Sequence, residues 1–318
     1  MAKDFAGAKY GGEADLRAAL SRGDQTLSRI EPILGHLLST PDHSLFSDEI
    51  LARLRGMLND LAWQILRVQA QATGQSGSEA FAERHGEALA MRLQENSALL
   101  SHCHAHAVEW QLTERLEAQF GVDPVLSPLL QDLIASEDTG TASTAMSALA
   151  AQARFVQAQR RMELPVSELP GDLFHSVLLT WRAYNGDRAS DALTRAEAKL
   201  RSDFDEASGR LALMARLATG VERGNENALL PEKAGVALFL TILAAKSGQD
   251  RGMVVLATNA RQVTRLAVSL RSAGLAATQI DEVLLQLHPQ AAPVAGLANL
   301  SPNEARSMLG DTRPDFGQ

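Results

Sequence analysis

The chain has 318 residues, of which 45% are hydrophobic, 21% charged and 4% aromatic, and its formal net charge at pH 7 is −8. This length and apolar content can fill one large hydrophobic core or two ordinary ones, which excludes a mainly disordered chain. The excess of acidic residues disfavours nucleic acid or an anionic membrane as the main partner, because both repel a negatively charged protein.

Cysteine content and hydropathy restrict the location of the protein. Cys103 is the only cysteine, which excludes a disulfide framework and gives no sign of an oxidising compartment. The first residues reach charged side chains at once and lack the apolar core of a secretion signal. The most apolar run, residues 235–245, is shorter than the ~20 residues of a membrane span. We therefore expect a cytoplasmic protein without a membrane span, and a buried core helix at 235–245.

Apolar periodicity predicts helices along the whole chain and no sheet. The N-terminal part is expected to contain a helix pair at residues 13–21 and 24–39, and a third helix that starts at Ser47 and ends at a Gly/Ser turn from residue 74. After this turn, one long helix is predicted over residues 78–120, because this stretch contains no proline. Two long helices joined by a short turn should form an antiparallel hairpin over residues 47–120.

The predicted hairpin carries more apolar surface than one partner helix can cover. Met57, Leu61 and Ile65 fall on one stripe of the first long helix, whereas Trp63 falls near the opposite side. Such surface favours a protein partner, with self-association of the chain through this hairpin as the specific expectation. The alternative is that the first two helices and the C-terminal half cover the hairpin completely.

The second half of the chain is predicted to be a multi-helical domain of irregular helix pairs. The expected helices cover residues 124–135, 141–162, 171–184, 189–219, 231–247, 250–273 and 278–287. A short capped helix at 301–309 and a mobile tail from residue 311 complete an all-α protein. The predicted domains are 1–122, an N-terminal helical bundle with the long hairpin, 123–290, the multi-helical domain, and 291–318, the short helix and tail.

One cluster of side chains has the composition of a metal site. On a helix, His102, His106 and Glu109 lie at positions i, i+4 and i+7 and share a face, so that they could bind one divalent metal ion such as Zn²⁺. The alternative is that they form a solvated or interfacial flank of the long helix. No other cofactor is predicted, since the chain lacks a phosphate-binding loop, a dinucleotide fingerprint and a serine-hydrolase motif.

His85 and Cys103 are two further residues with reactive side chains. His85 lies between charged residues on the same predicted helix, and an exposed histidine on a helical bundle can accept a phosphoryl group, which gives a histidine phosphorelay as a second alternative function. Cys103 falls on the apolar stripe, where burial would raise its pKa and make it a small hydrophobic side chain rather than a nucleophile. No catalytic residue is predicted. The leading hypothesis is a non-catalytic protein-interaction or regulatory protein.

Residues 153–175 (ARFVQAQRRMELPVSELPGDLFH) and 233–256 (KAGVALFLTILAAKSGQDRGMVVL) resemble a family of bacterial helical proteins known only as a domain of unknown function. The resemblance covers the C-terminal half of the chain and leaves the N-terminal hairpin outside. It implies a bacterial, cytoplasmic helical module and supplies no catalytic residue or cofactor.

Overall fold

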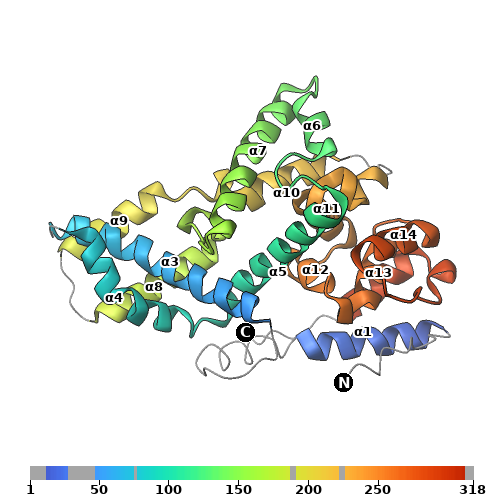
Figure 1. The fold of residues 1–318 in the computed structure, drawn as a ribbon, viewed down its shortest axis with the longest axis horizontal. Coiled ribbons are helices and arrows are strands. Elements are labelled where there is room, and N and C mark those ends of the chain that lie inside the picture. Colours follow the sequence, from blue (N-terminus) through green and yellow to red (C-terminus); the bar gives the residue numbers. More distant parts are fainter. Residues whose placement is uncertain (1–11, 28–46, 75–76, 187–190, 222–225, 312–318) are drawn as a thin grey trace. The chain divides into compact units, whose positions relative to one another are not determined.

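In the computed structural model the described residues are 12–27, 47–74, 77–186, 191–221 and 226–311, and all regular structure among them is helical (Figure 1). The predicted all-α class is therefore confirmed. No helix in these ranges is long and apolar enough to cross a membrane. Residues 28–39 of the helix predicted at 24–39, and the tail beyond residue 311, lie outside the described residues.

The α-helices have the following bounds: α1 Glu13–Leu27, α3 Asp48–Ala72, α4 Ser78–Leu93, α5 Ser97–Phe120, α6 Pro128–Ile134, α7 Thr139–Arg160, α8 Gly171–Asn185, α9 Asp191–Asp203, α10 Arg210–Gly220, α11 Pro231–Ser247, α12 Arg251–Ala257, α13 Val263–Ser272, α14 Ala277–Leu287 and α15 Pro302–Asp311. Short 3-10 helices are η1 Val166–Glu168, η2 Glu206–Ser208, η3 Glu226–Leu229, η4 Ala260–Gln262 and η5 Leu297–Asn299.

The chain divides into two compact units that are not continuous in sequence. Unit 1 comprises the described residues within Met1–Ile30, Gln111–Met146 and Met214–Gln318, and unit 2 those within Glu31–Trp110 and Ser147–Leu213. The predicted domain boundaries at residues 122 and 290 stay a prediction, because the division into compact units does not show which parts of the chain fold independently.

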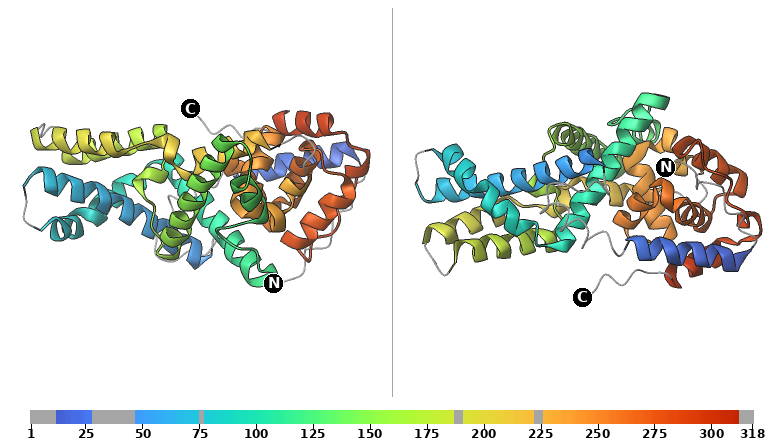
Figure 2. Two further views of the ribbon diagram at one scale, coloured as in Figure 1. Left: turned by 90° about the horizontal axis from the view of Figure 1, so that it is seen from above. Right: turned by 60° about the horizontal axis from the view of Figure 1, so that its bottom comes forward.

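Unit 2 is built around α3. Ser47 caps this helix by accepting a hydrogen bond from the backbone N–H of Ile50 at 3.3 Å, which confirms the predicted start. One face of α3 is fully buried and packs on α4 and α9, while α4 also packs on α8 (Figure 2). The apolar stripe predicted for this helix therefore forms the centre of the unit 2 core.

The single long helix predicted for residues 78–120 is wrong, because α4 ends at Leu93 and α5 begins at Ser97. Asn96 lies between the two helices, and its side-chain oxygen accepts a hydrogen bond from the N–H of Leu99 at 3.0 Å. This bond caps the start of α5 and competes with continuation of the preceding helix. The packing of α3 on α4 is observed, but a continuous hairpin over residues 47–120 is not.

Two other long predicted helices are divided in the same way. The stretch 189–219 forms α9 and α10, and Asp205 between them accepts a hydrogen bond from the N–H of Ala207 at 3.1 Å. The stretch 250–273 forms α12 and α13, and Asn259 accepts from the N–H of Arg261 at 3.0 Å. The opposite error occurs at the N-terminus, where α1 is continuous through residues 22–23, at which two helices were expected to separate.

Unit 1 contains the predicted buried helix. Every residue of α11 from Gly235 to Ala244 is buried, which confirms the core assignment up to the exposed Ala245. Gly235 interrupts the helix with φ of 69°, and a Cβ at this position would lie 2.8 Å from the Cβ of Ser127. Only glycine fits both the left-handed backbone and this close contact.

The terminal helices of unit 1 dock on α13. Asp24 of α1 forms a buried ion pair with Arg265 of α13, and α13 also packs on α15. At the start of α15, Ser301 and Glu304 bond reciprocally to each other's backbone N–H groups, at 3.2 and 2.8 Å. This capping box confirms the short helix predicted after Ser301.

Candidate functional site

The predicted metal ligands lie on α5 within unit 2, and the structure brings the two histidines together. The Nε2 atoms of His102 and His106 are 3.0 Å apart, and their rings meet edge to face with centroids 4.4 Å apart. His106 is buried, whereas His102 is half-buried. The i, i+4 spacing therefore produces the expected pair.

Glu109 is engaged by a cation that the sequence analysis did not identify. Its two carboxylate oxygens accept hydrogen bonds from Nη1 and Nη2 of Arg210 on α10, at 2.7 and 3.2 Å. Both side chains are buried, and the guanidinium also lies 3.6 Å from the ring centroid of Phe155. The positive charge that neutralises Glu109 is therefore Arg210. Within the described ranges, no group of three His, Cys, Asp or Glu side chains is arranged to hold a metal ion.

Arg210 also contacts the histidine pair. Its Nη2 atom lies 3.4 Å from Nδ1 of His106. Because a guanidinium can only donate, Nδ1 of His106 accepts, and the ring proton of neutral His106 lies on Nε2, where it donates to Nε2 of His102. A metal ion bound by both Nε2 atoms would have to displace this proton. The metal site stays a prediction, and its third ligand has another partner.

A second carboxylate completes this buried network. Nε of Arg210 lies 3.8 Å from a carboxylate oxygen of Glu168 in η1, and the side chain of Glu168 is 5% exposed. Burial raises the pKa of Glu168, whereas the nearby Arg210 and Arg154 lower it. One guanidinium thus stands between two carboxylates in the core. This arrangement fixes α5, η1 and α10 relative to one another within unit 2.

The sequence contained one signal for Arg210. It precedes Leu213 and Met214 by three and four residues, and both are buried. A charged residue at a core position of an amphipathic helix indicates a buried ionic partner. The partners Glu109 and Glu168 are more than 40 residues away in sequence, so spacing alone could not identify them.

The other two candidates for chemistry have different surroundings. His85 is half-buried; its Nδ1 lies 3.3 Å from the hydroxyl of Tyr184, and its ring packs on Phe81 with centroids 4.6 Å apart. Phosphorylation of His85 stays a prediction, although the side chain is less exposed than expected. Cys103 is fully buried, and burial raises the pKa of its thiol to about 12, as predicted for a core cysteine.

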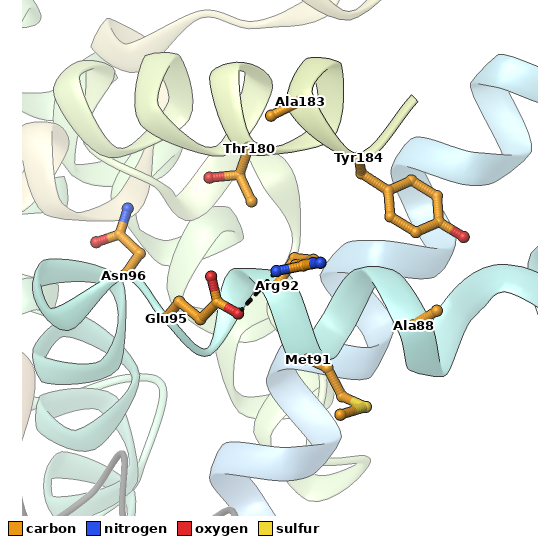
Figure 3. A pocket seen from close by; sticks show the side chains of 8 residues that line it. All are labelled: Ala88, Met91, Arg92, Glu95, Asn96, Thr180, Ala183 and Tyr184. Carbon is orange, nitrogen blue, oxygen red and sulfur yellow. Dashed lines mark hydrogen bonds and ion pairs between the residues drawn. The ribbon is translucent and has the colours of Figure 1, made fainter. Parts of the chain in front are cut away.

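A concave surface of unit 2 lies between α4 and α8, and we refer to it as the α4–α8 groove. It has a volume of about 1050 Å³. Figure 3 shows the two helices facing each other, with Thr180 and Glu95 directed into the space between them. The groove is lined by Ala88, Met91, Arg92, Glu95, Asn96, Thr180, Ala183 and Tyr184. The lining therefore combines apolar and uncharged polar side chains with one pair of opposite charges.

Two hydrogen bonds between the elements frame this groove. Near one end, the amide of Asn96 donates to the hydroxyl of Ser176, and at the other end Tyr184 meets His85. Since position 96 pairs with 176 and position 85 with 184, the two helices run antiparallel. The Met91 side chain, on the α4 wall, is 65% exposed. The groove is thus closed at both ends by hydrogen bonds between its walls, and an apolar side chain on one wall is exposed to solvent.

Trp63, which was expected to lack cover within the chain, is 36% exposed. Its ring lies against Gly86 of α4, where a Cβ would be 2.2 Å from Nε1 of the indole. Arg67 lies 5.8 Å from the ring centroid on another side. Because residue 86 has no side chain, the Trp63 ring can pack against α4, which covers part of the ring. The sequence analysis did not predict this contact.

Comparison of the chain with protein-family models, with curated proteins and with solved structures found no match. The resemblance of residues 153–175 and 233–256 to a bacterial helical family stays a prediction.

Proposed function

We propose that the chain is a non-catalytic, cytoplasmic helical protein that binds another protein chain, and that the α4–α8 groove is its binding surface. The observation that supports this proposal most strongly is the exposure of the Met91 side chain on the groove wall. Leu179 of α8, which is one helical turn from the groove residue Ala183, is also 54% exposed. Uncovered apolar side chains around a concave, polar-rimmed surface are typical of protein interfaces.

The contacts of the polar clusters support a binding role. Arg210, Glu109 and Glu168 are buried and pair with one another, so their charges are compensated within the interior of unit 2. The groove, in contrast, combines exposed apolar side chains with the exposed ion pair of Arg92 and Glu95, at 3.2 Å. A protein interface uses such a mixture for affinity and for orientation.

Photo-cross-linking tests this proposal directly. A photoreactive amino acid replaces Met91 in one variant and Gln157, an exposed residue of α7, in a control variant. In cells that express the protein, irradiation is expected to produce protein adducts from position 91 and far fewer from position 157. If position 91 produces no more protein adducts than position 157, the groove does not bind a protein.

Metal binding by His102 and His106 is the second candidate function, because their Nε2 atoms are 3.0 Å apart. Two such atoms can be ligands of one Zn²⁺ ion when both lone pairs face it. The protein is incubated with Zn²⁺, separated from free ions and analysed for bound metal. This hypothesis expects one zinc ion per chain and loss of that zinc in His102→Ala. A zinc-free wild-type protein contradicts it.

A further inference from the structure

We propose that the occupant of the α4–α8 groove is a second copy of this chain, docked around a two-fold axis that passes close to the C-terminal half of α4. The inference rests on the proposed function and specifies its partner. A two-fold interface requires a patch that is complementary to itself. The charges of Arg92 and Glu95 at the groove meet this requirement.

The charges of the groove are complementary under a two-fold rotation. Arg92 lies in the last turn of α4 and Glu95 in the turn that follows this helix, and their side chains are 62% and 66% exposed. When two copies meet around a two-fold axis that passes between these residues, Arg92 of each copy faces Glu95 of the other. Exposed pairs such as this one are weak, so the two side chains can exchange their intrachain contact for contacts across the axis.

The apolar residues allow the two copies to approach closely. Ala88 and Ala183 present only methyl groups to the groove, on opposite walls. Met91 lies on the same wall as Ala88, and its unbranched side chain adapts to irregular surfaces. With the axis between Arg92 and Glu95, the four charges lie at the centre of the contact, and Met91 of each copy lies beside them.

The groove is also preformed. The hydrogen bonds of Asn96 with Ser176 and of His85 with Tyr184 hold α4 and α8 together at both ends. A second chain therefore does not have to order this surface, which lowers the entropic cost of association. A preformed and self-complementary groove favours a second copy over an unrelated partner.

Charge reversal gives a test that is specific for this arrangement. Arg92→Glu leaves two glutamates on the groove face of each chain, and Glu95→Arg leaves two arginines. Each variant repels its own copies. In an equimolar mixture, however, every glutamate at position 92 or 95 of one variant faces an arginine of the other, so the mixed dimer recovers both contacts. Arg84→Glu, on an exposed turn of α4 outside the groove lining, is the matched control.

Sedimentation equilibrium at tens of micromolar measures the association. We expect the wild type and the Arg84→Glu control to be dimers. Association should be roughly tenfold or more weaker in each of the two groove variants alone, and it should recover when the two variants are mixed. Circular dichroism checks that each variant keeps its helical fold. A wild-type monomer overturns the second-copy inference but leaves a groove that binds another protein, which the cross-link at position 91 still tests. A dimer unaffected by both reversals, or a mixture that does not recover, places any self-association elsewhere and also overturns the inference.

Discussion

The guanidinium of Arg210 holds both carboxylate oxygens of Glu109 in the interior of unit 2, at 2.7 and 3.2 Å. The two residues are 101 positions apart in the sequence, and neither side chain is exposed to solvent by more than 1%. A buried ion pair adds little net stability compared with apolar packing, but the loss of one partner is costly because the other charge stays buried.

Glu109→Gln is therefore expected to lower the free energy of unfolding by about 3 kcal/mol, because the nearby Glu168 compensates the buried guanidinium charge only in part. Urea denaturation followed by circular dichroism measures this change. Asp203→Asn is the control, since its ion pair with Lys199 is exposed and should contribute less than about 1 kcal/mol. Equal effects of the two substitutions would show that the Arg210 network does not stabilise unit 2.

The pH dependence of stability is expected to include a contribution from Asp60 of α3. Burial raises the pKa of this carboxyl from 3.8 to about 6. Between these values the folded state keeps a proton that the unfolded state has lost, so the free energy of unfolding decreases as pH rises from about 4 through 6. Above that range the buried carboxylate makes its full unfavourable contribution.

Asp60→Asn should remove this contribution and keep the local contacts. One oxygen, Oδ2, accepts from both the Leu164 N–H at 3.0 Å and the Gln64 amide at 2.7 Å, and an asparagine oxygen can accept both bonds. Urea denaturation is expected to show the variant close to the wild type near pH 4 and more stable than the wild type near pH 7.5. A variant that is less stable at both pH values would contradict this assignment.

Gly86→Ala is expected to be destabilising even though alanine favours helices. The added Cβ would lie 2.2 Å from the indole nitrogen of Trp63, so that the ring must move outwards. We expect a loss of about 1–2 kcal/mol, as for other overpacked contacts, together with a red shift of tryptophan emission. Trp110 and Trp181 are buried elsewhere, so the shift reports on Trp63.

The matched control for this substitution is Gly310→Ala in α15, where the added Cβ meets no other atom within 4 Å. This variant should be neutral or more stable by up to about 1 kcal/mol, because alanine has the higher helix propensity. If Gly86→Ala has the same effect as Gly310→Ala, the contact with Trp63 does not constrain the packing of α3 on α4.

Periodicity predicted the helical class and the buried helix α11, but it did not locate the ends of the long helices. Asn96, Asp205 and Asn259 each divide a predicted helix, and each accepts a hydrogen bond from a backbone N–H two or three residues later. Short polar side chains of this kind compete with helical hydrogen bonds. Apolar period does not register this competition, because the apolar stripe continues on both sides of the break.

The candidate site could be predicted even less completely. The spacing of His102 and His106 was sufficient to predict their contact, because both are on one helix. The partner of Glu109 was not predictable from spacing, since Arg210 is on a helix that is 101 positions away in the sequence. The α4–α8 groove depends on the end of α4 at Leu93 and on the packing of α4 against α8. Neither feature follows from the continuous helix that was predicted for residues 78–120.

The α4–α8 groove, with a second copy of the chain as its occupant, is the proposed protein-binding surface. Sedimentation equilibrium of the wild type, Met91→Glu and Trp63→Glu at tens of micromolar distinguishes this interface from one on α3. We expect a wild-type dimer, at least about hundredfold weaker association in Met91→Glu, which would bury a charge in the interface, and a dimer in Trp63→Glu. A dimer that survives Met91→Glu but dissociates in Trp63→Glu would instead place the interface on α3.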